Sequence, residues 1–320
     1  MRPEYSLHAQ TRAKQRRMII FLRVSRWRGL LFGGIALFML PILFLAYAFS
    51  EAFWLEIKQV PVIDPNIPAA FDGVTIVFAT DIHHGRNFPI RRLRAFVNTV
   101  NQLHPDIVLF GGDYYQWREK YIKPVFAELT KIHAPLGKFG VFGNHDYWKD
   151  FLETARPARE QAGIAALDNQ AVWIVKDGAR IKIGGVGDWE EARQDLRPTV
   201  RDVTEQDFVI LLSHNPEFAE FIHTRKIDLV LSGHTHGGQV SLFGLWSPCA
   251  RRLQYGQKYL KGSIRTPFTT VMVSKGVGSV FLPMRFFARP DILVLTLKKP
   301  EKPLDIPRCA VIGKEYESNR

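Results

Sequence analysis

The stretch "VTIVFATDIHHGR", Val74 to Arg86, decides the fold class that the rest of the sequence supports. Its first seven residues, Val74 to Thr80, are all apolar or β-branched, which is typical of a buried strand. An aspartate and two histidines follow directly, at the end of the strand where open α/β sheets place their functional side chains. The stretch therefore predicts a buried strand that delivers polar groups to a site.

The same pattern recurs along the chain. Short runs rich in β-branched residues alternate with helical patterns, which predicts an α/β fold with a mixed sheet. The predicted helices are Ile90–Leu103, Lys123–Ile132, Leu152–Ala162 and Pro216–Thr224. The predicted strands are Val74–Thr80, Ile107–Phe110, Gly140–Phe142, Ala171–Val175, Ile181–Gly185, Val209–Leu212, Leu229–Leu231, Thr270–Ser274 and Ile292–Leu297.

Five of these strands end in carboxylate, imidazole or amide side chains. Taken singly, such residues are common in turns and caps. Five occurrences in one structural context predict a shared metal site instead. In "SGHTHGGQV", Ser232 to Val240, the glycines let two histidines one residue apart turn toward different points. The candidate ligands are Asp81, His83, Asp113, Asn144, His214, His234 and His236.

The types of candidate ligand restrict which metal the site would bind. Carboxylates, imidazoles and an amide without a thiolate suit Mn, Fe or Zn, and we expect Mn first. Seven ligands are too many for one ion. We therefore predict two divalent metal ions that share one carboxylate, as in two-metal hydrolases.

Two adjacent cations suit the hydrolysis of a phosphate ester. They neutralise phosphoryl oxygens and lower the pKa of a bridging water, so we expect attack by that hydroxide. His145 is predicted to give a proton to the leaving oxygen, and Arg86 to contact a substrate phosphate. For Asp146, orienting His145 and capping a helix are both open.

The order of these motifs resembles the calcineurin-like metallophosphoesterase family. The motifs are Asp81-Ile82-His83, Gly112-Asp113, Gly143-Asn144-His145-Asp146, His214 and Gly233-His234-Thr235-His236. The resemblance implies a four-layer sandwich of two mixed sheets flanked by helices. It also implies that Asp81, His83 and His236 hold one ion, that Asn144, His214 and His234 hold the other, and that Asp113 bridges them.

"GHTHGGQ", "GGDYY" and "KGVGSV…RPDILVLTL" further resemble bacterial membrane-anchored phosphoesterases related to the enzymes that cleave UDP-2,3-diacylglucosamine in lipid A synthesis. One departure from many relatives is that Tyr114 and Tyr115 follow Asp113, where an apolar residue and a second aspartate are common. The resemblance implies a phosphodiester or pyrophosphate bond in a lipid-linked or cell-envelope substrate.

An uncharged run of 21 residues, Gly29 to Phe49, predicts a transmembrane helix. The alternatives are a buried core helix, which is rarely so uniformly apolar, and a cleaved signal peptide, which usually has a shorter apolar region. Residues 1–28 hold eight Lys or Arg and one acid, so we expect a cytoplasmic N-terminus, an extracytoplasmic catalytic domain and a lipid bilayer as partner. The remaining 35 basic and 30 acidic residues make nucleic acid an unlikely partner despite the net charge of +12.

These patterns give five segments. They are a basic tail (1–28), the transmembrane helix (29–49), a proline-rich linker (50–70), the catalytic domain (71–300) and a C-terminal tail (301–320). Two other functions stay open, namely a UDP-2,3-diacylglucosamine pyrophosphatase and a non-catalytic membrane-tethered binding module. The first requires a cytoplasmic nucleotide substrate, which conflicts with the predicted orientation.

Overall fold

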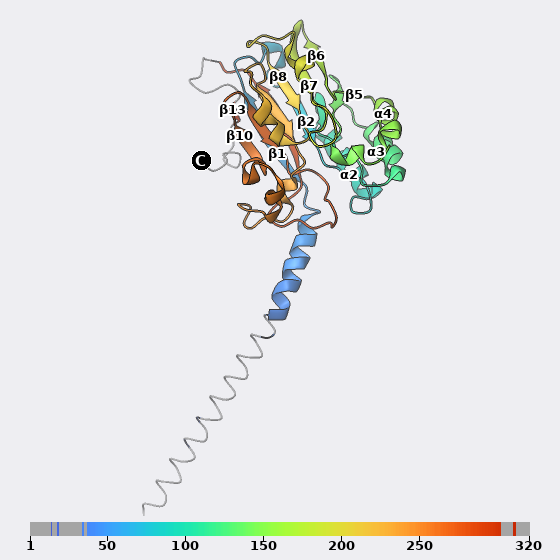
Figure 1. Cartoon of the computed structure of the whole chain (residues 1–320), viewed down its shortest axis with the longest axis vertical. Coiled ribbons are helices and arrows are strands. Elements are labelled where there is room, and N and C mark those ends of the chain that lie inside the picture. Colours follow the sequence, from blue (N-terminus) through green and yellow to red (C-terminus); the bar gives the residue numbers. More distant parts are fainter. Residues whose placement is uncertain (1–13, 15–17, 19–33, 35–36, 302–309, 312–320) are drawn as a thin grey trace, which may run out of the picture. The chain divides into compact units, whose positions relative to one another are not determined.

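The computed structural model describes residues 14, 18, 34, 37–301, 310 and 311. The chain divides into two units, residues 1–48 and 49–320, and the second contains both sheets (Figure 1). One sheet has seven strands and the other has six, and each combines parallel with antiparallel pairs. The prediction of two mixed sheets in an α/β fold is confirmed.

The seven-stranded sheet has the order β13-β1-β12-β2-β3-β4-β5. Four of its neighbouring strands, β2 to β5, run parallel, so their carboxyl ends lie along one edge. Its strands are β1 (Glu56–Ile63), β2 (Thr75–Ala79), β3 (Ile107–Phe110), β4 (Lys138–Gly140), β5 (Ile164–Ala166), β12 (Asp291–Lys298) and β13 (Ala310–Val311).

The six-stranded sheet has the order β10-β11-β9-β8-β7-β6, with β11, β9, β8 and β7 parallel. Its strands are β6 (Gln170–Lys176), β7 (Ala179–Gly185), β8 (Val209–Leu212), β9 (Leu229–Ser232), β10 (Gly262–Arg265) and β11 (Thr270–Val273). In each sheet, the carboxyl ends of a group of parallel strands therefore lie along one edge.

Alternating apolar side chains produce a layered core. In β2, Ile76 and Phe78 join the cluster that fills the space between the two sheets, with Ile210 and Leu231 among the residues of the facing sheet. Val77 faces the opposite way, into a cluster with α2 (Ile90–Gln102), α3 (Ile122–Leu129) and α4 (Leu152–Gln161). Figure 1 shows these three helices together on one side of the domain.

The outer face of the six-stranded sheet is covered by helices that are shorter than α2, α3 and α4. Val209 and Val230 pack there with Phe218 of η4 (Pro216–Phe221), and Val200 of α5 (Arg197–Val200) lies against the same cluster. Pro216–Thr224, predicted as an α-helix, is thus a shorter 3-10 helix. The layers run helix, sheet, sheet and short helices.

Several strand predictions differ from the structure, and β5, β10 and β13 were not predicted. β4 is Lys138–Gly140, whereas the predicted strand was Gly140–Phe142. β1 lies inside the predicted linker, where Pro61 argued against a strand. The strand tolerates Pro61 because alternate residues of β1 donate to the β12 side, in register with Glu56 N and Asp64 N, so the N–H that Pro61 lacks is not part of this pairing.

The prediction of a transmembrane helix over residues 29–49 is wrong for the described part of the chain, where no helix is long and apolar enough to cross a membrane. Residues 29–33, 35 and 36 lie outside the described residues. The predicted orientation of the catalytic domain stays a prediction.

We predict that Leu295→Ala lowers the free energy of unfolding by about 2–5 kcal/mol, because Leu295 of β12 is fully buried between the sheets and its loss leaves a cavity. Denaturant titration measures the change. Val175→Ala is the control: Val175 is 63% exposed in β6, and its substitution should cost at most about 0.5 kcal/mol. Equal losses in both variants would contradict the proposed inter-sheet core.

Candidate metal centre

The loops after β2 and β3 run side by side beyond their strands. Asp81 N donates to Gly112 O and His83 N to Asp113 O, both at 2.9 Å. To keep this pairing while turning their side chains inward, Asp81, His83 and Asp113 adopt left-handed backbone angles, with φ of 54°, 46° and 55°. Such angles are costly for residues other than glycine and cluster at functional sites.

The carboxylate of Asp81 joins the two sheets. Its Oδ2 atom accepts hydrogen bonds from Thr80 Oγ1 at 2.9 Å and, across the sheet interface, from His234 N at 3.0 Å. A Cβ atom on Gly233 would lie 2.2 Å from that oxygen. The glycine before His234 is therefore required by close approach, which explains one of the three glycines in the histidine loop.

The other oxygen of Asp81 faces two imidazoles. His236 Nε2 lies 3.3 Å and His83 Nε2 3.8 Å from Asp81 Oδ1, and the two nitrogens are 3.1 Å apart. Asp81 Oδ1 is buried and has no hydrogen-bond partner. Donor atoms that surround one ion at about 2.1 Å are separated by about 3.0–3.4 Å. The two distances from His236 Nε2 lie in this range, and the distance between His83 Nε2 and Asp81 Oδ1 is somewhat longer.

Asp113 lies between this group and a second one. Its Oδ2 atom is 3.3 Å from His83 Nε2 and 3.4 Å from His214 Nε2. The other ring nitrogen of His214 donates to Gly111 O at 2.7 Å, which leaves Nε2 as the ligating atom. Three overlapping groups could each hold an ion: Asp81, His83 and His236; Asp81, Asp113 and His214; and His83, Asp113 and His145.

Asn144 and His234 lie at the far side of His214. The rings of His214 and His234 are 5.2 Å apart, and Asn144 Oδ1 is buried without a hydrogen-bond partner. Glu190 contacts both residues, with its carboxylate 3.3 Å from Asn144 Nδ2 and 3.5 Å from His234 Nε2. Five of the predicted ligands, Asp81, His83, Asp113, His214 and His236, thus lie in the overlapping groups, whereas Asn144 and His234 lie next to Glu190.

Glu190 and Asp188 were missed by the sequence analysis. They follow β7, a strand that was predicted, so the same strand-end rule that found the other ligands could have found them. Asp188 is buried, and its Oδ2 atom has no hydrogen-bond partner. Its Oδ1 atom accepts from Glu190 N at 2.9 Å, which fixes the turn that carries Glu190.

Burial sets the charge states of the site. It lowers the pKa of His83 to about 3 and that of His234 to about 4, and it raises the pKa of Asp81 to about 6. Burial also lowers the pKa of His214, but the carboxylate of Asp113 outweighs it and holds that pKa well above its usual value. The imidazoles of His83 and His234 are therefore neutral near pH 7 and ready to ligate a cation.

Asp146 neither orients His145 nor serves merely as a helix cap. Its carboxylate accepts from the backbone N–H groups of Asp113 at 2.7 Å, Tyr114 at 2.9 Å and Gly143 at 2.9 Å. It therefore ties the β3 loop to the β4 loop. His145 N instead donates to Asp113 Oδ1 at 2.9 Å, and the His145 ring lies 4.7 Å from that of His83.

A buried arginine, also unforeseen, supports the histidine loop. Arg285 Nη1 donates to His236 O at 2.9 Å and to Lys275 O at 2.8 Å, and Arg285 Nη2 lies 3.2 Å from His236 Nδ1. Burial lowers the pKa of Arg285 to about 10, so it remains a cation. His84, in contrast, donates to Phe88 O, and Arg86 is exposed.

Known proteins share this sequence pattern. A model of the calcineurin-like phosphoesterase family matches residues 74–238. The uncharacterized metallophosphoesterase YkuE of Bacillus subtilis is 32% identical over 78% of this chain and 88% of its own, and an uncharacterized metallophosphoesterase of Aquifex aeolicus is 30% identical over 79% and 95%. A protein of Danio rerio named as a transmembrane protein with a metallophosphoesterase domain is 29% identical over 75% and 56%.

The matched segment begins at the first strand of the site and ends just after His236, so it contains all seven candidate ligands. This chain belongs to the calcineurin-like metallophosphoesterase family and is a metal-dependent phosphoester hydrolase.

Proposed function

We propose that this protein hydrolyses a phosphodiester or pyrophosphate bond of a lipid-linked or cell-envelope substrate with two divalent cations. The observation that carries the proposal is the convergence of Asp81, His83 and His236 on one side of Asp113 and of His214 on the other. Asp81, His83 and His236 would hold one cation, and Asn144, His214 and His234 the other. Asp113 would contact both.

The cations would supply Lewis acidity toward the phosphoryl oxygens and lower the pKa of a bound water. The protein's own contribution is to keep its ligands fixed before substrate arrives. Asp146 does so by holding the loops of β3 and β4 together, and Arg285 by holding the backbone of His236. Because such a site does not have to rearrange during the reaction, no free energy of reorganisation is added to the barrier.

His145 is the candidate proton donor to the leaving oxygen. It is half-buried beside the ligands, its Nδ1 atom has no hydrogen-bond partner, and its backbone is fixed by Asp113. Arg86, exposed three residues after His83, is the candidate contact for a substrate phosphate. Manganese, with iron or zinc as the other possibilities, fits the nitrogen and oxygen ligands.

Turnover by the purified full chain with Mn²⁺ tests the function directly. We expect bis-p-nitrophenyl phosphate or a UDP-linked lipid to be cleaved faster than p-nitrophenyl phosphate. A folded chain that binds Mn²⁺ but cleaves none of the three would contradict hydrolysis and favour a binding module. Preference for the monoester would contradict the proposed bond type alone.

Asp113→Ala should abolish the binding of both cations, because the Oδ2 atom of Asp113 lies 3.3 Å from His83 Nε2 and 3.4 Å from His214 Nε2. We expect metal affinity and turnover to fall by at least about 100-fold, since even residues that only support a ligand cost 10–100-fold. Metal analysis after dialysis measures the first effect. Retention of two tightly bound ions by Asp113→Ala would refute the bridging role.

His234→Ala and His236→Ala should each remove a different cation, since the Nε2 atom of His236 faces Asp81 and His83 whereas the ring of His234 lies beside His214. Each variant should bind one ion, and anomalous scattering from crystals soaked in Mn²⁺ would locate the one retained. The same remaining position in both variants would disprove the division of ligands.

His145→Gln should keep both cations but lower kcat by about 10²–10⁴-fold, the usual contribution of a general acid. The loss should be larger for a dialkyl phosphate diester, whose alkoxide leaving group needs a proton, than for bis-p-nitrophenyl phosphate, whose p-nitrophenolate leaves without one. An equal loss for both leaving groups would assign His145 to substrate binding instead of proton donation.

A further inference from the structure

Two loops beside the metal centre expose large apolar side chains. In the first, Leu242, Phe243, Leu245 and Trp246 are 54%, 70%, 69% and 44% exposed. In the second, Phe281 and Leu282 are 68% and 55% exposed. We call these six side chains the apolar loop surface. Scattered exposed apolar residues are ordinary, but a contiguous group marks an interaction site.

Hydrogen bonds join the two loops into one surface. Gln239 accepts from Val280 N at 2.9 Å through Oε1 and donates to Val280 O at 3.0 Å through Nε2. Ser241 N donates to Phe286 O at 2.8 Å, and the rings of Phe243 and Phe287 lie 5.6 Å apart. Because the backbone is fixed at both loop bases, the apolar side chains are held outward together.

The apolar loop surface is continuous with the candidate metal centre. The Trp117 ring lies 5.1 Å from the ring of Phe281 and 5.6 Å from that of His145. Asn87, just past the first ligand loop, donates to Phe281 O at 2.9 Å. An apolar layer that covers these loops would therefore border the place where a phosphate ester reacts.

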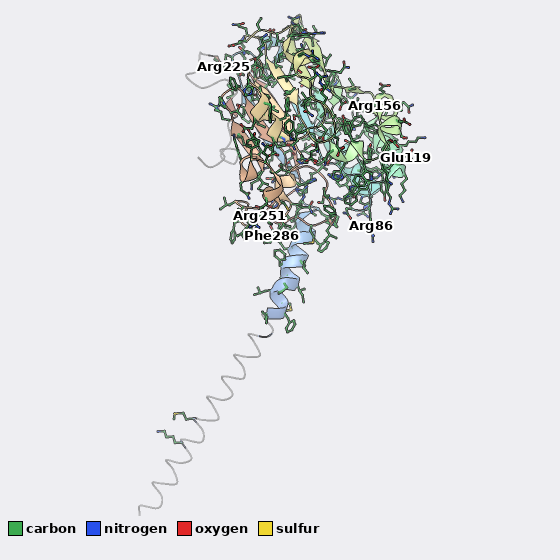
Figure 2. The ribbon with its side chains drawn as sticks, in the orientation of Figure 1. Arg86, Glu119, Arg156, Arg225, Arg251 and Phe286 are labelled. Carbon is green, nitrogen blue, oxygen red and sulfur yellow. The ribbon has the colours of Figure 1, made fainter. Side chains whose placement is uncertain are left out.

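The segment that carries the apolar loop surface is basic, although Glu51 accepts hydrogen bonds from Phe287 N and Ala288 N beside it. Residues 239–290 contain eight Lys or Arg and no Asp or Glu. A Cβ atom on Gly244, within the first loop, would lie 2.9 Å from Lys261 Nζ. Next to the second loop, Arg92 lies over the ring of Phe53 at 4.4 Å and donates to Asn87 O. Figure 2 shows Arg251 and Phe286 at the same end of the domain.

We propose that the apolar loop surface docks onto an anionic lipid bilayer, with its aromatic and aliphatic tips in the interfacial region and the surrounding cations at the headgroups. Aromatic side chains are favoured at that depth, and each nearby Lys or Arg adds attraction to anionic lipid. The docking is peripheral and independent of turnover. It would give the metal centre access to phosphate esters embedded in the membrane.

Residues 1–49 contain a basic segment and an apolar run of their own, so binding of the whole chain to vesicles would not report on this surface alone. A local probe is needed. We would replace both cysteines, Cys249→Ser and Cys309→Ser, and attach a nitroxide to Leu245→Cys in the full chain. The matched control is a nitroxide at Val175→Cys, on the exposed face of β6.

With vesicles of phosphatidylglycerol and phosphatidylcholine, the label at 245 should show a severalfold rise in the ratio of oxygen to nickel accessibility, and the label at 175 should show none. Raising the salt concentration, or omitting phosphatidylglycerol, should reduce the rise. Adding Phe243→Ser and Phe281→Ser should return the label at 245 to water, whereas Phe221→Ser, an exposed apolar site on η4, should not.

Three results would overturn the proposal. A label at 245 that stays open to nickel on vesicle-bound chain would show that the surface remains in water. Restricted motion without oxygen access would indicate a protein partner or a second copy of the chain. Equal insertion without anionic lipid would exclude the role of the cations. Since none of these measurements needs substrate, they are separable from a failure of the proposed hydrolysis.

Discussion

The carboxylate of Asp81 is the point on which the two sheets and the metal centre depend. One of its oxygens accepts the backbone N–H of His234 from the opposite sheet, and the other faces His83 and His236 without a hydrogen-bond partner. A buried carboxylate that is only half satisfied costs free energy, about 1–3 kcal/mol for an unmet acceptor and more when it is charged. A cation at this point would remove that cost. The same carboxylate that joins the two sheets therefore favours the binding of a metal ion.

The backbone around the centre is strained in a consistent way. Asp81, His83, Asp113, His234 and His236 all have φ between 46° and 68°, and each such residue costs about 1–3 kcal/mol. The strain persists because both flanks are rigid: the strands behind it are fully buried between two layers, and Asp146 binds three backbone N–H groups of the neighbouring loops. Side chains that would splay apart in relaxed turns are therefore directed into one volume, as metal ligation requires.

Much of this arrangement could be predicted because strand burial and strand-end chemistry are local signals. Val209–Leu212 and Ile107–Phe110 have the predicted bounds, and the ligands after them lie where parallel strands end. β1 was missed because Pro61 is a negative local signal that only the strand's neighbours override. The transmembrane helix was predicted from composition alone, and no helix in the described part of the chain is long and apolar enough to cross a membrane. Arg285 could not be foreseen, since its seven backbone and side-chain partner atoms come from segments up to 49 residues away.

The loop that contains His234 and His236 both supplies candidate metal ligands and holds one of the two apolar loops in place. Its histidines face the metal centre, whereas Gln239, three residues after His236, fixes the loop that exposes Phe281 and Leu282. Arg285 reinforces this link, because it binds the carbonyl of His236 and follows Leu282 by three residues. A movement of the apolar loops relative to the ligands would have to break these hydrogen bonds, of which that of Arg285 is buried. The position of the outer surface and the position of the metal ligands are therefore set by one rigid element, so a substrate presented at that surface would meet a centre already in place.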